Sequence, residues 1–266
     1  MSVVTKKLDR MEYLVAENIS VPHCFTTRLG GVSRGHLESL NLVASRGDDP
    51  ANVVENFRIV GAALGFKPEN VVMAHQTHSD IVLRVGAEHR GAGVVKPSLP
   101  ECDALITNEP GVALFISTAD CTPILLCDPV TGAVGAAHAG WRGTASAIGA
   151  KTVKAMCEAF GCDPKDLRAA IGPNIGLCHF ETDADVPEAM LAAYGAEAEP
   201  YIFPKGNKFY LDLKAINALS LRRAGVEHIE LSDACTVCQC DRFWSHRVTR
   251  GVRGAQGAII MKGESL

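Results

Sequence analysis

The chain has 266 residues, of which 47% are hydrophobic and 21% are charged, and its formal net charge is −4. This composition is ordinary for a globular protein in water, and no run of basic residues provides the surface that binds nucleic acid. The first fifteen residues lack the apolar core of a secretion signal, and the most apolar stretch, residues 111–126, is too short and interrupted to span a membrane. We therefore expect a cytoplasmic monomer without a membrane or nucleic-acid partner.

The first half of the chain predicts strands at residues 12–19 and 24–28, separated by a Gly-rich surface loop from a helix within residues 48–66. The helix has Asp48 or Asp49 as its cap, Pro50 in its first turn, and apolar residues at helical spacing. Residues 70–85 indicate a strand, a break and a second strand. Four short apolar runs, at 103–107, 111–118, 122–128 and 133–140, indicate a group of buried strands.

The second half predicts a helix at residues 144–161, closed by Gly161, and a strand at 167–173. Further helices are expected near 186–194 and 213–224, and strands near 229–232 and 258–261. No repeat or linker divides the chain, so residues 1–266 are predicted to form one domain. The mixed order of elements favours an α/β or α+β fold with a mixed sheet over a Rossmann fold.

Ten cysteines are many for this length, and without a secretion signal most of them are expected to be reduced and buried. Cys121 and His138 stand out because each lies at the end of a predicted buried strand. His78 lies in the break of residues 70–85. Three such breaks can meet at one edge of a sheet and form a pocket. From the residues alone, a reactive thiol with its base, a metal site and two packing residues all remain open.

Other residues add to the candidate site. Arg28 and Arg142 lie in Gly-rich turns, where guanidinium and backbone groups can hold an anion together, although Arg142 can equally stack on Trp141 at the surface. A separate segment, "CTVCQCDRFWSH", contains Cys235, Cys238, Cys240 and His246 and resembles half of a structural zinc site. No second CxxC pair follows it at zinc-ribbon spacing, so this signal is weak, and a thioredoxin-like redox role is weaker still.

Taken together, the motifs resemble the YfiH/DUF152 proteins, which are also called laccase-domain or multicopper polyphenol oxidase proteins. The resemblance runs from about residue 25 to residue 260. Its matching stretches, in order, are "FTTRLGGVSRGHLESLNL", "GDDPANVVENFR", "HQTHSD", "CDALIT", "ADCTPILLCD", "AAHAGWRGT", "IGPNIGLCHFE", "YLDLKAINALSLRRAGV" and "CTVC…FWSHR".

The resemblance implies one domain of stacked mixed β-sheets flanked by helices, like the cytotoxic-necrotizing-factor deamidases. It implies one zinc ion held by His78, Cys121 and His138, with His75 outside the ligand position. The implied activity is phosphorolysis of adenosine, inosine, guanosine and methylthioadenosine, together with deamination of adenosine. Copper binding in vitro and a copper-dependent polyphenol oxidase activity are further alternatives, but three ligands do not provide the several copper ions of a laccase, so we treat oxidase activity as secondary. The "ENFR" and "GVRG" segments depart from the family pattern, which leaves the roles of Arg58 and Arg253 open.

For this chemistry we expect Asp120 or Asp103 to act as the acid/base group, with Asp80 as an alternative. Arg28 and Arg142 are expected to hold phosphate, and Gln76 to contact the substrate. A cysteine hydrolase with Cys121 as nucleophile and His138 as base is the alternative enzyme. A zinc-bound interaction module without any turnover is the non-enzymatic alternative.

Overall fold

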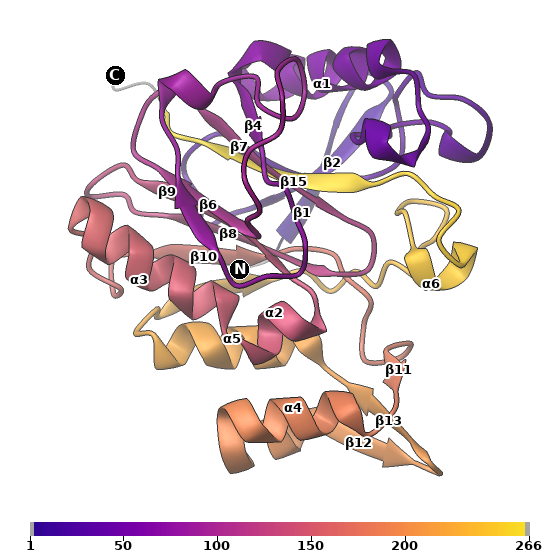
Figure 1. The fold of residues 1–266 in the computed structure, drawn as a ribbon, viewed down its shortest axis with the longest axis vertical. Helices are drawn as coiled ribbons and strands as arrows, with labels where there is room; N and C mark the ends of the chain where they lie inside the picture. Colours follow the sequence, from indigo (N-terminus) through magenta and orange to yellow (C-terminus); the bar gives the residue numbers. More distant parts are fainter. Residues whose placement is uncertain (1–2, 264–266) are drawn as a thin grey trace.

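The computed structural model describes residues 3–263, and two six-stranded sheets lie at its centre (Figure 1). The first sheet has the order β1-β2-β3-β15-β7-β4 and the second the order β14-β10-β8-β9-β6-β5. Both mix parallel and antiparallel pairs: β4 pairs parallel with β7, and β8 pairs antiparallel with β9. The predicted class, stacked mixed sheets flanked by helices, is confirmed.

The strands are β1 (Val3–Leu8), β2 (Met11–Ala16), β3 (His23–Thr26), β4 (Val71–Met73), β5 (Val82–Arg84), β6 (Ala104–Thr107), β7 (Ala113–Thr118), β8 (Thr122–Cys127), β9 (Val134–Ala139), β10 (Arg168–Ile171), β11 (Glu181–Thr182), β12 (Ile202–Lys205), β13 (Lys208–Leu211), β14 (His228–Leu231) and β15 (Gln256–Met261). The α-helices are α1 (Pro50–Leu64), α2 (Trp141–Ala145), α3 (Ile148–Phe160), α4 (Asp185–Tyr194), α5 (Leu213–Arg223) and α6 (His246–Thr249). Short 3-10 helices occupy Gly35–Leu37, Ala44–Arg46, Pro68–Asn70, Ala87–His89 and Gly195–Tyr201.

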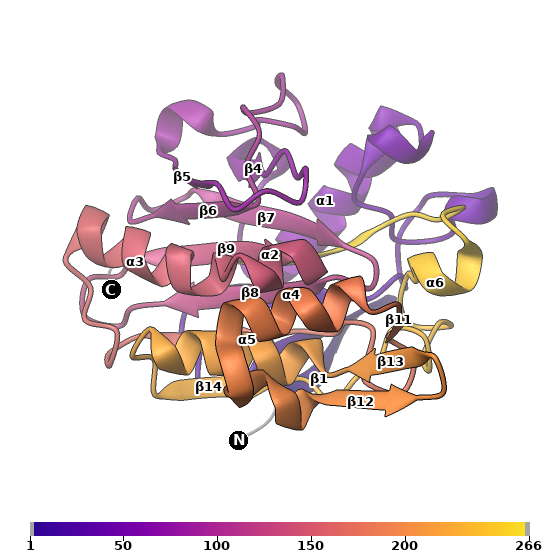
Figure 2. The same ribbon diagram turned by 60° about the horizontal axis from the view of Figure 1, so that its bottom comes forward.

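The chain forms four layers, with the two sheets inside and helices on both outer faces (Figures 1 and 2). A central core between the sheets joins side chains such as Phe25 and Ile116 of the first sheet to Leu105 and Leu125 of the second. Helix α1 packs on the outer face of the first sheet, and α3 and α5 cover the outer face of the second. Because strand side chains alternate between faces, each central strand contributes to two of these cores.

Helix α1 forms where the sequence predicts it, since the Asp49 side chain accepts a hydrogen bond from the Ala51 backbone N–H and Pro50 occupies the first turn. The helix predicted at 144–161 is different. Helix α2 begins already at Trp141, and α3 begins at Ile148 after Ala147 adopts a left-handed conformation with φ of 57°. The prediction was wrong here because alanine gives no local signal for such a break.

A small third sheet, β11-β13-β12, was not predicted. This sheet lies beside α4 (Figure 2). Together they surround a separate apolar cluster, which includes Met190 and Leu211 and extends to Trp141 of α2. Among the described residues, no helix is both long and apolar enough to cross a membrane.

The connection between β7 and β8 carries the chain from the first sheet to the second in three residues, Ala119, Asp120 and Cys121. Asp120 makes the turn with a φ of +88°, which few residues other than glycine adopt. Strand β8 then pairs with β9 so that Thr122 faces Ala139. This sharp corner places Cys121 at the end of a hairpin and beside the residues that follow β9.

Candidate functional site

The structure brings together His78, Cys121 and His138, which we call the three-residue cluster. Their ligand atoms all lie within 4.8 Å of one another, and the centroids of the two imidazole rings are 4.9 Å apart. His138 is buried, Cys121 is partly buried and His78 is exposed, so one side of the cluster faces solvent. Two nitrogens and one sulfur with an accessible side are a donor set that fits zinc, and also copper.

Backbone geometry brings these side chains close to one another. His78, like Asp120, has a positive φ (+61°), and such strained residues cluster at functional sites. A Cβ atom placed on Gly140 would lie 2.6 Å from Nδ1 of His78 and 3.3 Å from Sγ of Cys121. Only glycine therefore fits at this position while His78 and Cys121 stay in place. The sequence marked Gly140 merely as a turn residue.

Asp103 is fully buried, and its carboxylate accepts hydrogen bonds from the three-residue cluster and the loop around it. Nδ1 of His138 lies 2.7 Å from Oδ1, which also accepts from the backbone N–H of His78. Oδ2 accepts from the backbone N–H groups of Thr77 and Ser79 and from the Ser79 hydroxyl. Burial raises the pKa of Asp103, but the bonds from His138 and Ser79 outweigh it and lower the pKa to about 2. This arrangement favours a role in orienting His138 over a role in proton transfer.

The Asp103 contact leaves Nε2 of His138 as the atom available to a metal ion. Burial lowers the pKa of His138, yet Cys121 and Asp103 together raise it to about 9. The pKa of His78 is lowered, first by burial and then by the neighbouring His138. Without a metal ion, His138 therefore holds a proton at neutral pH, and a metal ion must displace that proton.

Asp120 is 8% exposed, and its carboxylate accepts three hydrogen bonds from one segment. The donors are the Thr236 hydroxyl at 2.6 Å, the Ser245 hydroxyl at 3.1 Å and the Arg247 backbone N–H at 2.7 Å. Asp120 thus joins the corner that carries Cys121 to residues 236–247. The third acid, Asp80, forms an ion pair with Lys151 and lines neither of the cavities described next.

Two cavities meet at the three-residue cluster, with volumes of about 470 and 370 Å³, which are typical of small-molecule sites. Both are lined by Arg46, His78, Ala119, Cys121 and Arg253. The larger one continues along polar groups, including Gln76 and Ser117. The smaller one continues along two aromatic side chains, Trp141 and Phe180.

Gln76 lines the larger cavity, but its amide is already bonded. Its Nε2 donates to the carbonyl of Ser117, and its Oε1 accepts from the backbone N–H and hydroxyl of the same residue. Gln76 therefore fastens the loop of His78 to β7. His75 lines the same cavity outside the cluster, with Nδ1 3.2 Å from the carbonyl of Leu99.

The structure separates the two arginines that the sequence singled out. Arg142 lines the smaller cavity, and its guanidinium stacks 4.2 Å above the Trp141 ring. It therefore stacks on Trp141, as one expectation had it, and also borders a cavity that could hold an anion, as the other had it. Arg28 lines neither cavity. It stacks 3.9 Å above Trp244 and donates to the carbonyls of Glu38 and Cys240.

Two other arginines occupy the position where the cavities join. Arg253 is partly buried, and its buried Nε has no hydrogen-bond partner among the described residues. Burial and the nearby charge of Arg46 lower the pKa of Arg253. The pKa of His246 is also lowered, by burial and then by Arg253. A crowded positive region with an unpaired donor fits an anion. Arg46 carried no recognisable signal in the sequence.

The weak half-site signal at Cys235, Cys238, Cys240 and His246 does not correspond to one group of neighbouring side chains. Cys235 and Cys238 instead lie beside Cys178 and His179. His246 lines the smaller cavity, and Cys240 is outside the group. The sequence signal was weak because the other two members of the group come from a segment about 60 residues earlier in the chain.

The chain matches the family described as multi-copper polyphenol oxidoreductase laccase over residues 22–263. A purine nucleoside phosphorylase of Deinococcus radiodurans is 40% identical over 247 residues, which are 93% of this chain and 91% of that protein. The purine nucleoside phosphorylase YfiH of Escherichia coli is 36% identical over 227 residues, covering 85% and 88% of the two chains.

Solved structures show the same fold. The crystal structure of YlmD from Geobacillus stearothermophilus superposes with a TM-score of 0.92 at 35% identity, covering 98% of this chain and 100% of that one. The YfiH protein of Bacillus licheniformis gives a TM-score of 0.91 at 33% identity and covers 97% and 98% of the two chains. The expected family resemblance is therefore confirmed across nearly the whole chain.

Proposed function

We propose that this chain, which belongs to the multi-copper polyphenol oxidoreductase laccase family, is a zinc-dependent purine nucleoside phosphorylase. Relatives that share 36–40% of their residues with it carry that activity in their names. The observation that carries the proposal is the junction of two cavities at the three-residue cluster, flanked by unpaired arginine charge.

The phosphate position follows from charge. Arg253 offers a buried Nε without a partner, and Arg46 lies close enough to lower its pKa. A phosphate dianion between them would satisfy the free donor and relieve the repulsion between the two guanidinium groups. Arg142 remains a second candidate, because it borders the smaller cavity. Arg28 is no longer a candidate for binding phosphate, because its guanidinium donates to two carbonyl oxygens and stacks on Trp244.

The purine position follows from shape and polarity. Trp141 and Phe180 provide flat apolar surfaces in the smaller cavity, and purine rings stack well on such side chains. The ribose would then lie at the junction near Arg253. A phosphate oxygen attacks C1′ while the bond to the purine nitrogen breaks, and the electron pair of that bond leaves with the purine. The proton of the phosphate dianion passes to the purine, so the products are ribose 1-phosphate and the neutral free base.

His78, Cys121 and His138 would hold the zinc ion, and Asp103 would keep His138 in the orientation that leaves Nε2 free. When bound there, zinc would supply a Lewis acid at the junction of the two cavities, for phosphorolysis and also for hydrolytic deamination of adenosine. Asp120 holds residues 236–247 against the corner that carries Cys121. Adenosine, inosine, guanosine and methylthioadenosine are the substrates to be tested, and the proposed location is the cytoplasm.

Incubation of the purified protein with adenosine, with and without phosphate, tests the proposal. Adenine and ribose 1-phosphate that form only with phosphate establish phosphorolysis, and inosine formed in either mixture establishes deamination. Turnover of neither kind for any of the four nucleosides would overturn the assignment.

A second candidate, the cysteine hydrolase, is favoured by one observation: Asp103, His138 and Cys121 stand in the order acid, imidazole and thiol. His78 at the same point speaks for a metal ion instead. Metal-free protein whose Cys121 is rapidly alkylated would decide for the hydrolase. Protein with zinc that is lost on chelation, together with its activity, would decide for the phosphorylase.

A further inference from the structure

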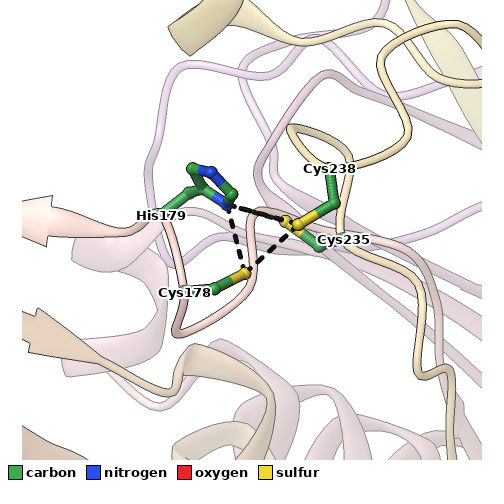
Figure 3. A group of neighbouring side chains, drawn as sticks. All are labelled: Cys178, His179, Cys235 and Cys238. Carbon is green, nitrogen blue, oxygen red and sulfur yellow. Dashed lines mark hydrogen bonds between the residues drawn. The ribbon is translucent and has the colours of Figure 1, made fainter.

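A second group of metal-binding side chains lies outside the cavities of the proposed active site. Cys178 and His179 belong to the connection between β10 and β11, and Cys235 and Cys238 to the connection between β14 and α6. We call these residues the four-residue cluster. Figure 3 shows the three sulfurs and the Nδ1 atom of His179 pointing toward one another from the two segments.

The distances within the four-residue cluster match a tetrahedral zinc site. Nδ1 of His179 lies 3.1 Å from Sγ of Cys178, 3.4 Å from Sγ of Cys238 and 3.8 Å from Sγ of Cys235. Sγ of Cys178 lies 3.5 Å from Sγ of Cys238. Zinc bonds of about 2.3 Å to sulfur and about 2.0 Å to nitrogen place tetrahedral ligand atoms roughly 3.5–3.8 Å apart.

The backbone around Cys235 also suits a bound thiolate. The backbone N–H of Gly176 donates to Sγ of Cys235 at a distance of 3.2 Å. Thiolate is the form of cysteine that binds metal.

We propose that Cys178, His179, Cys235 and Cys238 bind one Zn²⁺ as a closed structural site. Four protein ligands complete the tetrahedral coordination of zinc, so no position remains for water or substrate. The ion joins two segments that are about 60 residues apart in sequence. This assignment does not depend on the proposed phosphorylase activity.

The two joined segments border the smaller cavity. The first contains Ile175 and Phe180, and the second leads to His246 and Arg247. The guanidinium of Arg247 already donates to the carbonyls of His179 and Glu181 across the gap between the segments. Among the described residues, the only strand pairing between these two segments is the isolated bridge of Asn174 with Cys235. A zinc ion bound by both segments would therefore hold this side of the cavity in place.

A disulfide is the competing use of these thiols. Cys178 and Cys238 are close enough for one to form after a small movement, but their sulfurs are well beyond the bond length of about 2.05 Å. A disulfide would also leave His179 and Cys235 without a role, although both face the same point.

The first experiment uses the wild-type protein, purified without chelator or added zinc. Zinc is measured per chain, and accessible thiols are alkylated and located by peptide mass spectrometry before and after chelation. We expect Cys178 and Cys238 to resist alkylation until the chelator is added, although both are exposed at the surface. Rapid alkylation in zinc-saturated protein, or a disulfide between them, would overturn the proposal.

The second experiment compares variants. The double variant Cys178→Ser/Cys238→Ser should contain one zinc equivalent less than wild type, while Cys240→Ser, a matched control in the same segment, should keep the wild-type content. Cobalt exchanged into Cys121→Ala should still show intense sulfur-to-cobalt charge transfer, because three thiolates remain in the four-residue cluster. An unchanged zinc content in the double variant, or loss of that absorption in Cys121→Ala, would show that the cluster binds no metal.

Discussion

The three-residue cluster and the four-residue cluster contain the same kinds of side chain but differ in number and surroundings. The first has three side chains that could bind a metal ion, one of them exposed to solvent, and two cavities meet at it. The second has four such side chains, which come from two loops. An incomplete ligand set leaves room for chemistry, whereas a complete set provides stability. The number of side chains that converge therefore distinguishes a candidate catalytic site from a candidate structural one more clearly than their identity does.

The surroundings of the two clusters differ as well. In the three-residue cluster, the Asp103 carboxylate contacts the His138 ring. Arginine side chains line the adjoining cavities. In the four-residue cluster, a backbone N–H group, that of Gly176, donates a hydrogen bond to the Cys235 sulfur instead. Five predictions test this contrast.

Cys121→Ala should have the largest effect. We expect it to remove the metal ion from the three-residue cluster and lower kcat/KM for nucleoside phosphorolysis by about 10³-fold or more, because the Lewis acid is lost. Zinc in the four-residue cluster should stay. Metal analysis and a phosphorolysis assay measure both effects, with Cys240→Ala as the matched control. Normal activity in Cys121→Ala would disprove the role of this cluster in catalysis.

Asp103→Asn should weaken zinc binding at the three-residue cluster by about 10- to 100-fold, because His138 loses the carboxylate that orients its ring. Added zinc should restore most of kcat. Since the pKa of Asp103 is about 2, its carboxylate is charged throughout the assay range and adds no titration step of its own. A zinc affinity equal to wild type would contradict the orienting role.

Arg253→Met should raise the KM for phosphate by about 10- to 100-fold, because a charged hydrogen bond to phosphate contributes about 1.5–3 kcal/mol. The KM for the nucleoside should change much less. Steady-state kinetics with each substrate varied in turn measures the difference. Arg250→Met, which changes an exposed arginine three residues earlier, is the control. Equal effects on both KM values would argue against a phosphate site at Arg253.

Acidification should release zinc from the three-residue cluster. In the metal-free protein the pKa of His138 is raised to about 9, so below that pH zinc must displace a proton. We expect the affinity to fall about tenfold for each pH unit between 8 and 6. Titrating zinc into metal-free Cys178→Ser/Cys238→Ser isolates this cluster from the other. An affinity independent of pH would mean that His138 is not a ligand.

The double variant Cys178→Ser/Cys238→Ser should have the smallest effect on chemistry and a clear effect on stability. We expect kcat to stay within about threefold of wild type. The Tm should fall by about 10 °C, because a ligand that binds only the folded state no longer stabilises it. Thermal unfolding with and without chelator measures this. A loss of activity as large as that of Cys121→Ala would end the distinction between the two clusters.

Much of the fold could be predicted because local signals agreed with the final packing. Asp49 and Pro50 begin α1, and the apolar runs of β7, β8 and β9 are buried strands. The third sheet escaped prediction because β12 carries a proline and is largely exposed, so its residues show no burial pattern. Local rules cannot detect a strand that is stabilised mainly by its neighbours.

The candidate site divides in the same way. Residues alone indicated that Cys121, His138 and His78 lie at breaks that can meet, and the family resemblance assigned them to one metal site. Nothing in the sequence linked Cys178 to Cys238, since contacts across about 60 residues leave no local pattern. Arg46 was missed for the same reason: its importance arises only where the loop before α1 meets Arg253.

The three-residue corner at Asp120 has one more consequence. It is the shortest link between the two sheets at this site, and it carries the only sulfur of the three-residue cluster. Because the corner ends directly at β8, which pairs with β9, the position of Cys121 relative to His138 is set by the register of this strand pair. A substitution that shifts β8 against β9 would therefore move the Cys121 sulfur relative to His138, and we expect it to lower turnover in a protein that is still folded.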